Sequence, residues 1–561
     1  MKESVGRSKH KLTLVSVCEL MLLIGIGGPA MALLFGTAPA AHRRPADIGT
    51  QGPASGPRPP AMPQNRVDTS MPRGKGRVLE ASSSEGLQAA LDQARPGDVV
   101  DLKPGIALRG NFILPKKTAG DADRNSKWIT ITSSRLLPGL LPAGRVSPAL
   151  TGRLPILTSM NSEPALRAAP GSGYYRLIGI EMTIAPSVSI NYGILRLGEG
   201  TETSVEELPH DIVVDRCYIH GLPSSNLRRG IALNCARSAV IHSWISECHE
   251  AGADSQAICC WNGPGPFEIS DNYLEASGEN VMFGGADPSV PGLIPSDITF
   301  TQNYCRKPLT WRAPSQARAK WSVKNLFELK NARRVLIDSN VFDNTWVDAQ
   351  TGYAVLFKSV DQDGKAPWSA TTDVTFRRNL VRHASSCVNI EGRDTNNPSG
   401  RTERVLIENN RFEDINSGRW GGEGVFIKMT GAQDVAIDHN TVLATGSILI
   451  AYGEPNDRFA FTRNVVCHNS YGIKGDGTAT GTPTLQRFFR GYVVSGNVII
   501  GGVAPSYPPG NCFSSTQDVS VQQSGTVHVP GCPGSDDKSA GCDLNLIELL
   551  AAAGAPPGPA D

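Results

Sequence analysis

Four charged side chains recur at the same place in neighbouring short segments of this sequence. The segments FELKN, AVLFKS, CVNIEG and GVFIKM carry Lys330, Lys358, Glu391 and Lys428 after an apolar residue. Lys330 is expected directly beside Lys358, and like charges on adjacent strands lower the pKa of one or both groups. A lysine with a lowered pKa is a candidate base. The stripe therefore predicts proton-transfer chemistry centred on Lys330.

Other polar residues share this face or follow it in the loops. Glu328 and Asn389 are expected on the same face, and Asn280 is expected one segment earlier. Asp287 and Arg393 follow the stripe within a few residues. Hard oxygen ligands of this kind suit Ca²⁺, so Glu328, Asn280 and Asp287 are predicted as calcium ligands. The alternative is that the aspartates simply form turns.

The stripe contains the groups that β-elimination or C5-epimerisation of a uronate polymer requires. Both reactions need a cation or donor at the uronate carboxylate and a base for the C5 proton, and elimination also needs an acid for the leaving oxygen. Lys330 is predicted as the base, and Lys358 or Arg393 as the acid or the charge stabiliser. Glu391, Lys428 and Asn389 are predicted to bind the sugar. A second interpretation is a solvated face on which Lys and Glu pair across strands, each pair contributing about 0.2–1 kcal/mol.

A long insertion before Lys330 adds aromatic residues. Trp311 and Arg312 are predicted to form one wall of a sugar-binding groove, because aromatic faces stack on sugars. Alternatively these side chains cover the flank of the molecule.

The elements that position the stripe are predicted by a repeated asparagine. The template apolar-x-apolar-x-x-Asn-x-apolar recurs at intervals of 24 to 39 residues. Period-two alternation indicates strands, and a spacing near 30 leaves room for about three short strands per coil of a solenoid. Stacked coils allow the amides to form a hydrogen-bonded ladder, so these residues are structural. They are Asn272, Asn303, Asn340, Asn379, Asn410, Asn440, Asn464 and Asn497, with Cys217 and Trp244 at the matching place in earlier coils.

The segment SSEGLQAALDQARPGDVVDLKPG precedes the coils and predicts a capping helix from Ser84 through Ala94. With the asparagine ladder, it resembles the N-terminus of pectin-lyase-like β-helix proteins, over roughly Val78 to Gly502. The resemblance implies an all-β fold: a single-stranded right-handed parallel β-helix of at least ten coils over residues 76–505, with an N-terminal capping helix. The stretch NLFELKN, followed one coil later by a basic residue, resembles the site region of family-six polysaccharide lyases, which cleave alginate or dermatan.

The two ends of the chain predict export and an irregular tail. An apolar run with Ala38-Pro39-Ala40 after it indicates a signal peptide over residues 1–40, or an uncleaved membrane anchor. Residues 41–75 are rich in Pro, Gly and Ala and are predicted to be a linker. Residues 506–561 form the tail, which Cys512, Cys532 and Cys542 are candidates to staple. A secreted, periplasmic or cell-surface protein is expected.

The near-equal numbers of basic and acidic residues limit the classes of binding partner. With 54 basic and 53 acidic residues, the net charge of +1 argues against nucleic acid. We expect a monomer that acts on an acidic polysaccharide, with no membrane span beyond the N-terminal segment. A lyase or C5-epimerase is the leading hypothesis. A galacturonase-like hydrolase and a non-catalytic glycan-binding protein are the alternatives.

Overall fold

The structure is a computed structural model that describes residues 56–71, 76–117, 128–134, 144–313 and 320–515, with short pieces between 520 and 550. The chain divides into two compact units, residues 1–52 and 53–561. The predicted leader and the first part of the predicted linker lie outside the described residues. Within the described ranges, no helix is both long and apolar enough to cross a membrane.

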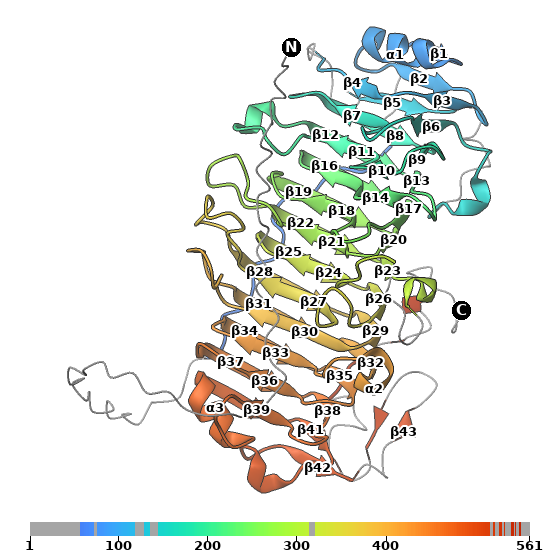
Figure 1. Cartoon of the computed structure of the whole chain (residues 1–561). Coiled ribbons are helices and arrows are strands. Elements are labelled where there is room, and N and C mark those ends of the chain that lie inside the picture. The colour runs from blue at the N-terminus through green and yellow to red at the C-terminus, as the bar shows by residue number, and fades with distance from the viewer. Residues whose placement is uncertain are drawn as a thin grey trace, which may run out of the picture. The chain divides into compact units, whose positions relative to one another are not determined.

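Three parallel sheets make up the second unit, and successive strands along the chain join them in turn (Figure 1). Sheet A contains β1 (Val78–Ala81), β2 (Val99–Leu102), β5 (Ile129–Thr132), β8 (Gly173–Ile178), β12 (His210–Asp215), β16 (Ala236–Ile241), β19 (Gly265–Ser270), β22 (Ser296–Thr301), β25 (Ala332–Asp338), β28 (Thr371–Arg377), β31 (Glu403–Glu408), β34 (Gln433–Asp438), β37 (Asn456–Thr462) and β40 (Phe489–Ser495).

Sheet B contains β3 (Ala107–Arg109), β6 (Ile156–Ser159), β9 (Glu181–Ile184), β13 (Tyr218–His220), β17 (Trp244–Cys248), β20 (Tyr273–Ala276), β23 (Tyr304–Arg306), β26 (Val341–Thr345), β29 (Leu380–Ala384), β32 (Arg411–Ile415), β35 (Thr441–Ala444), β38 (Val465–Cys467), β41 (Val498–Ile500) and β42 (Cys512–Ser514). Sheet C contains β4 (Phe112–Leu114), β7 (Leu166–Ala168), β11 (Leu195–Leu197), β15 (Arg229–Leu233), β18 (Gln256–Cys260), β21 (Glu279–Phe283), β24 (Phe327–Leu329), β27 (Tyr353–Lys358), β30 (Ser386–Glu391), β33 (Ile427–Thr430), β36 (Leu449–Ala451) and β39 (Ile473–Gly475).

Smaller elements complete the fold. A parallel pair joins β10 (Ile190–Asn191) to β14 (Asn226–Leu227), and an antiparallel pair joins β43 (Ser520–Val521) to β44 (Val527–His528). The helices are α1 (Ser84–Gln93), α2 (Ser417–Trp420) and α3 (Thr482–Phe488). The molecule is a right-handed parallel β-helix, the hand that crossovers between parallel strands adopt almost without exception. The predicted fold class is confirmed.

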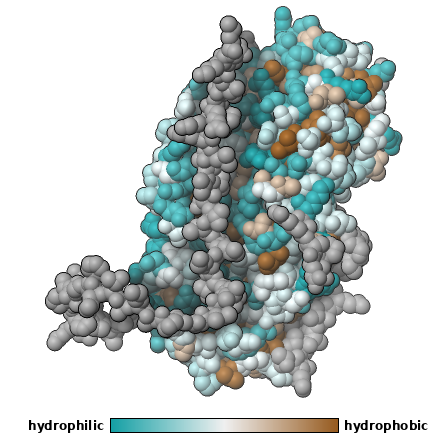
Figure 2. All heavy atoms as spheres, in the orientation of Figure 1, coloured by the Kyte–Doolittle hydropathy of each residue, from teal (hydrophilic) through white to brown (hydrophobic). Residues whose placement is uncertain are grey.

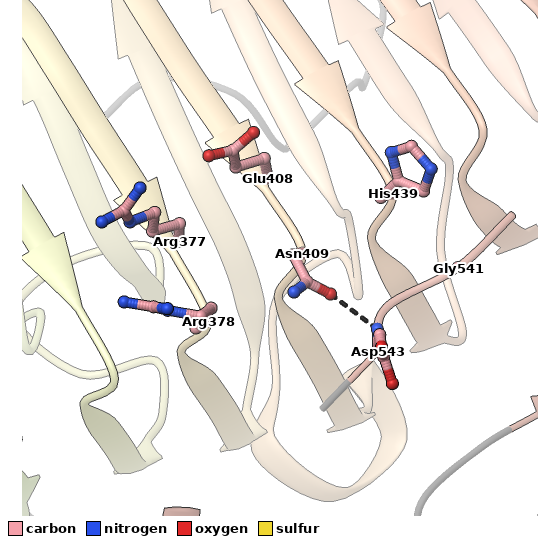
Figure 3. A pocket seen from close by; sticks show the side chains of 7 residues that line it. All are labelled: Arg377, Arg378, Glu408, Asn409, His439, Gly541 and Asp543. Carbon is pink, nitrogen blue, oxygen red and sulfur yellow. Dashed lines mark hydrogen bonds between the residues drawn. The ribbon is translucent and has the colours of Figure 1, made fainter. Parts of the chain in front are cut away.

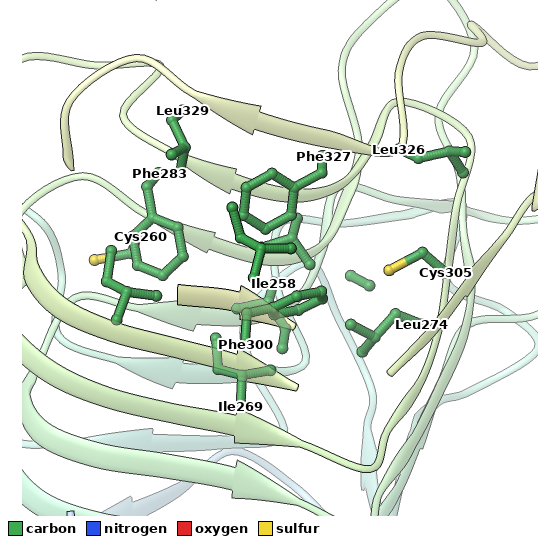
Figure 4. Close-up of a cluster of buried hydrophobic side chains, with 14 of the residues drawn as sticks. Ile258, Cys260, Ile269, Leu274, Phe283, Phe300, Cys305, Leu326, Phe327 and Leu329 are labelled. Atoms are coloured by element: carbon green, nitrogen blue, oxygen red, sulfur yellow. The ribbon is translucent and has the colours of Figure 1, made fainter. Parts of the chain in front are cut away.

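Alternating apolar residues fill the space between the three sheets. Figure 4 shows Phe283, Phe300 and Phe327 packed with aliphatic side chains from neighbouring coils, all of them fully buried. Phenylalanines also stack along the axis, with the ring centroids of Phe300 and Phe342 at 6.3 Å and those of Phe342 and Phe376 at 5.7 Å. Each buried side chain of this size contributes about 1.5–3 kcal/mol, so the core is one continuous stack.

The asparagine ladder is present at the turn from sheet A to sheet B. Asn340 is typical: its Oδ1 accepts from the backbone N–H of Asn303 at 2.9 Å and from the Asn303 side chain at 3.1 Å. The ladder continues beyond the predicted positions to Asn511. One prediction is wrong by a residue, since Ser243 and not Trp244 matches the ladder and bonds Asn272.

Both ends of the solenoid are covered as expected, with small differences. Helix α1 buries Leu87, Ala90 and Leu91 against the first coil, and its N-cap is Ser83, whose hydroxyl accepts from the Gly86 amide at 3.0 Å. Ser84 is therefore the first helical residue and not the cap. At the other end a disulfide joins Cys512 to Cys532.

Residues 56–71 fall within the predicted linker, and we call them the strap. The strap lies extended on the outer face of sheet A, visible as the blue segment in Figure 1. Its backbone N–H groups bond carboxylates of the solenoid, for example Ala61 N to Asp373 Oδ1 at 3.1 Å. Composition correctly indicates that this segment has no core of its own, but the solenoid provides partners for its backbone.

Candidate functional site

A cluster of charged side chains lies on the outer face of sheet C. The Lys330 ammonium is 3.9 Å from Glu328 Oε1, and the Lys358 ammonium is 3.2 Å from Glu391 Oε1. Glu328 is 1% exposed, while both lysines are about one fifth exposed. Glu328 therefore lies beneath the surface, whereas Glu391 and the two ammonium groups reach it. In the orientation of Figure 2, the coloured surface is mainly hydrophilic or neutral.

The strand register confirms part of the predicted column. Leu329 pairs with Phe357, so Lys330 and Lys358 follow adjacent strand positions, and Lys358 pairs with Glu391. Lys428 is misplaced in the prediction, because it pairs with Asn389 and Thr430 pairs with Glu391. The reason is that Ile427 and Met429 are the inward residues of β33, so Lys428 faces outward one row nearer the strand start.

The four residues at the C-terminal side of the cluster contact one another. Asn389 Nδ2 donates to Glu391 Oε1 at 3.1 Å, and the Tyr452 hydroxyl lies 3.5 Å from the same oxygen. The Lys428 ammonium sits 5.2 Å from the centre of the Tyr452 ring. Tyr452, absent from the predicted site, thus links the two predicted sugar-binding residues Glu391 and Lys428 and offers an aromatic face beside the Lys428 ammonium.

A row of polar residues at the strand starts was missed by the sequence analysis. Gln256, Glu279 and Asn325 occupy corresponding positions of β18, β21 and the segment before β24. Gln256 Nε2 donates to Glu279 Oε2 at 2.7 Å, and Asn325 Nδ2 donates to Glu328 Oε2 at 2.9 Å. All three are fully buried, and Gln256 Oε1, Glu279 Oε1 and Asn325 Oδ1 make no hydrogen bond with any described residue.

Lys324 was not predicted either. It adds its ammonium group to those of Lys330 and Lys358 and lies beside the row of Gln256, Glu279 and Asn325. Its Nζ lies 2.6 Å from Asp254 Oδ1 and 3.5 Å from Glu279 Oε1. Burial lowers the pKa of Lys324, but the attraction of Glu279 and Asp254 outweighs burial and the net shift is upward. Lys324 is therefore a fixed cation at the edge of the cluster.

Electrostatics correct the predicted state of Lys330. Burial lowers its pKa, yet Glu328 and Glu279 raise it by more, so the pKa of Lys330 lies above its ordinary value. For Glu328, burial raises the pKa, and the attraction of Lys330 and Lys358 lowers it to below its ordinary value. The expected depression by Lys358 is wrong because carboxylates separate and neutralise the two lysines. Lys330 holds its proton in the free protein.

The position of Lys330 requires a glycine on the neighbouring coil. Gly284 precedes it by one coil at a φ of +105°, where a Cβ would come within 2.7 Å of Lys330 Cβ. A side chain at this position would therefore displace the lysine, besides straining the backbone.

The predicted calcium ligands do not come together. Asn280 faces the interior, where its Oδ1 accepts from the Lys307 ammonium at 2.9 Å. Both carboxylate oxygens of Asp287 accept backbone N–H groups of residues 362–365. Of the three, only Glu328 stays with the cluster. No group of three or more His, Cys, Asp or Glu side chains placed to hold a metal occurs in the described part of the chain.

A different set of oxygens fits a hard cation better. Gln256, Glu279 and Asn325 each leave one buried oxygen without a hydrogen bond, on adjacent strands beside Glu328. The Glu279 oxygen also has the Lys324 ammonium 3.5 Å away. Buried oxygens without a hydrogen bond cost free energy unless an ion or water satisfies them, and amide and carboxylate oxygens are the ligands Ca²⁺ takes. These four residues, with Lys324 as the resident competing cation, are the ones that would hold such an ion.

Three predicted residues lie away from the cluster. Arg393 is exposed in the loop after β30 and donates to the Ser399 carbonyl at 2.9 Å. Trp311 is buried with Trp321, Trp346 and Trp420, so it packs in a tryptophan cluster and presents little surface to a sugar. Arg312 covers Trp420, with the guanidinium 5.1 Å from the ring centre. The alternative interpretation of these tryptophans as a cover on the solenoid is the one the packing supports.

Several cavities lie elsewhere along the solenoid, and two of them lie at the turn to sheet B and at the end of sheet C. The first, of about 410 Å³, is on the turn from sheet A to sheet B (Figure 3) and is lined by Arg377, Arg378, Glu408, Asn409, His439, Gly541 and Asp543. Arg377 and Arg378 both bond Asp338, and His439 bonds Asp438, so its cations already have partners. The second, of about 270 Å³, lies at the C-terminal coils of sheet C and is lined by Glu423, Val425, Thr445, Gly446, Ser447, Ser470, Tyr471 and Lys474.

The chain is similar to several solved β-helix structures at low identity. An alginate lyase from Paenibacillus sp. str. FPU-7 is 14% identical with a TM-score of 0.32, covering 78% of this chain and 97% of that one. The PL6 family alginate lyase AlyGC is 12% identical with a TM-score of 0.47, covering 83% and 57%. A GH87 α-1,3-glucanase from Streptomyces thermodiastaticus strain HF3-3 is 12% identical with a TM-score of 0.42, covering 80% and 69%.

No family model matches the chain, and no curated protein sequence matches it. The structural similarities include both lyases and a glycoside hydrolase, at TM-scores below 0.5, and carry no argument about activity.

Proposed function

We propose that the chain is a lyase or C5-epimerase acting on a uronate polysaccharide, with the cluster on sheet C as its active site. The observation that carries this proposal is the order of charges in depth: Glu279 and Glu328 are buried, while Lys330 and Lys358 are about one fifth exposed above them. A surface of ammonium groups held by buried carboxylates suits an anionic sugar chain. It also offers proton-transfer groups to the sugar.

Each lysine has a distinct role in this proposal. Lys330 is the base for the C5 proton, and Lys358, held by Glu391, protonates the leaving oxygen. Because the pKa of Lys330 is raised, only its small unprotonated fraction acts at neutral pH, and the rate rises toward alkaline pH. A divalent cation bound by Glu279 and Glu328 would take up their negative charge and so lower the pKa of Lys330.

The binding face extends beyond the reacting groups. Lys428 and Lys474 lie in the same outward row of sheet C, joined through Ile450. Lys474 also lines the 270 Å³ cavity, together with Tyr471. A polyanion running across the strands from Lys330 toward β39 therefore meets Lys358 on β27 and then a lysine on every second strand, β33 and β39.

A glycoside hydrolase is the second candidate, and one observation favours it. The pKa of Glu279 is raised, by burial and then by Asp254, while the pKa of Glu328 is lowered. Two carboxyl groups with pKa values pushed apart are typical of an acid and its partner in hydrolysis. Both carboxylates are almost fully buried, however, and therefore lie beneath the lysines and out of reach of a polymer.

The test is an assay of a panel of uronate polysaccharides in buffered D₂O. Elimination produces the ultraviolet absorbance of an unsaturated uronate, and epimerisation produces deuterium at C5 without chain cleavage. Lys330→Ala should lose about 10²–10⁴-fold in rate, and Lys103→Ala, an exposed lysine in the first coils, should lose nothing. Reducing ends without unsaturation would establish hydrolysis, and an undiminished rate in Lys330→Ala would remove the site assignment.

A further inference from the structure

The strap contacts sheet A with a period of three residues. Its amide groups at every third position donate to aspartates: Arg58 N to Asp434 Oδ1 at 3.0 Å, Ala61 N to Asp373 Oδ1 at 3.1 Å, and Gln64 N to Asp297 Oδ1 at 3.0 Å. A proline precedes each donor directly. These prolines, Pro57, Pro60 and Pro63, are half-buried, whereas the residues between them are exposed. The same face of the strap thus returns every third residue.

A period of three with this composition is that of a polyproline II helix, which rises about 3.1 Å per residue and so about 9.3 Å per turn. The three aspartates are spaced by two coils each, because Asp373 aligns with Arg334 and Arg404 on either side. Two coils of a parallel sheet span about 9.6 Å. One turn of the strap therefore matches two coils of the solenoid, so the contacts stay in register along its length.

The solenoid side is an alternating row of acids and arginines. At one position of successive coils, each residue has a positive φ, for example 59° at Asp373 and 55° at Arg404. Each aspartate also binds the arginine of the following coil: Asp297 with Arg334, Asp373 with Arg404 and Asp434 with Arg458. The left-handed backbone turns these carboxylates outward. Because aspartate and arginine alternate from coil to coil, one aspartate is available for each turn of the strap.

The end of the strap is held by a different group. Arg176 is 1% exposed, and its guanidinium donates to the carbonyls of Thr69 and Ser70 at 2.6 Å each. Val67 packs against Val213 and Ala239 on the outer face of β12 and β16. The strap therefore covers side chains that would otherwise be exposed along at least eight coils of sheet A.

We propose that the outer face of sheet A is a recognition surface for a polyproline II chain, and that its ligand is the strap of the same molecule. The surface recognises three features of its ligand: a backbone N–H that points toward it at every third residue, a proline directly before that residue, and a helical pitch that equals the spacing of two coils. Nothing in this recognition depends on the covalent link through residues 72–75, so the strap should behave as a bound peptide.

The test cuts the full-length protein at a protease site inserted within residues 72–75. After cleavage at neutral pH, the N-terminal fragment should remain bound through size-exclusion chromatography. The triple variant Asp297→Asn, Asp373→Asn, Asp434→Asn should release it. The matched control is Asp211→Asn, which removes an aspartate of the same row that pairs with Arg237.

A register variant tests the pitch directly. One alanine inserted after Met62 moves Gln64 out of phase with Arg58 and should weaken retention like the triple variant, while a Met62→Ala substitution should not. The proposal would be overturned if the cleaved protein without further substitutions lost the fragment, or if the register variant retained the fragment equally well.

Hydrogen exchange on the uncut chain covers the case in which a variant fails to fold. The amides of Ala61 and Gln64 should exchange about tenfold or more slowly than that of Met62, as expected for a hydrogen bond to a carboxylate. Asp373→Asn should speed exchange at Ala61 alone. Uniform fast exchange along residues 58–65 would show that the strap is not recognised.

Discussion

The outer faces of sheets A and C both carry charged side chains on successive strands, but they differ in how these groups are satisfied. On sheet A, Asp434 accepts hydrogen bonds from the backbone and side chain of Arg58 and from Arg458. On sheet C, Glu279 and Asn325 each leave a buried oxygen without a hydrogen bond among the described residues. The aspartates beneath the strap on sheet A therefore accept several hydrogen bonds each, whereas the row on sheet C keeps buried oxygens without one.

This difference separates stability from function. A buried polar atom without a partner costs about 1–3 kcal/mol, so a cluster of them persists where a ligand or reaction uses it. A carboxylate that already accepts several hydrogen bonds contributes to folding and has little capacity left for a substrate. We expect substitutions on sheet C to change activity and substitutions on sheet A to change stability.

The largest effect is expected from Lys358→Met on sheet C. Loss of the proposed acid should reduce kcat/KM by about 10²–10⁴-fold. Stability should change by less than about 1 kcal/mol, because the Lys358–Glu391 pair is partly solvent-exposed. Activity assays and urea denaturation of the same preparation measure both. A variant that loses stability and keeps its rate would place Lys358 among the structural ion pairs.

The converse substitution is Asp373→Ala on sheet A. It removes two hydrogen bonds from Arg404 and one from the Ala61 amide, and should cost about 2–4 kcal/mol of unfolding free energy. The rate at 25 °C should be unchanged, since Asp373 lies on the opposite sheet from the lysines. A reduced kcat with unchanged stability would contradict the separation of the two faces.

Acid should weaken sheet A in a defined range. The pKa of Asp297 is lowered to about 2, because Arg334, Asn65 and the Gln64 amide outweigh the effect of burial. A folded-state pKa below the unfolded value of about 3.9 contributes stability that is complete above that pH and is lost as pH falls toward 2. Protection of the strap amides, measured as exchange relative to the intrinsic rate at the same pH, should therefore fall between about pH 4 and pH 2, before the coils open. Unchanged protection at pH 3 would contradict this order.

Glu328→Gln should alter the pH dependence on sheet C. Glu328 is the main group that raises the pKa of Lys330, so a neutral amide should move the alkaline limb of kcat/KM toward neutral pH. Gln keeps the shape and the contact with Asn325. The measurement is the pH profile and not the rate at one pH. A limb at the same pH in both proteins would show that Lys330 is not the titrating base.

The fold could be predicted from the sequence because its signals repeat. The asparagine position recurs with the same neighbours in eight coils, and each recurrence independently supports the same strand register. The contacts of the strap could not be predicted, for the opposite reason. Its Pro-rich composition indicates an extended chain without a core, and only the three-dimensional spacing of Asp297, Asp373 and Asp434 shows what that chain binds.

The site was predicted in part, and its errors have one physical source. At the corner between sheets B and C two consecutive residues face inward, such as Leu326 and Phe327 or Ala354 and Val355. Strict alternation fails there, so Asn280 was assigned outward and Glu279 was missed. The charged strand ends lie beyond the corner, where alternation holds, and Lys330, Lys358 and Glu391 were found together. Attraction by Glu328 and Glu279 reversed the expected pKa shift of Lys330, and contacts between neighbouring strands cannot be deduced from a single strand.

The smallest expected effect tests whether the unsaturated row on sheet C holds a cation. Millimolar Ca²⁺ should move the alkaline limb toward neutral pH and raise the rate at pH 7 by a few-fold, about the effect of partly neutralising Glu279 and Glu328. Chelation should reverse the change. Lys324→Met should strengthen the response, because it removes the ammonium that lies 3.5 Å from Glu279. Asp287→Asn, a change at a predicted ligand that instead holds a loop, should leave the response intact. If neither the original protein nor Lys324→Met responds to Ca²⁺, the buried oxygens only stabilise the charged lysines, and calcium has no part in this site.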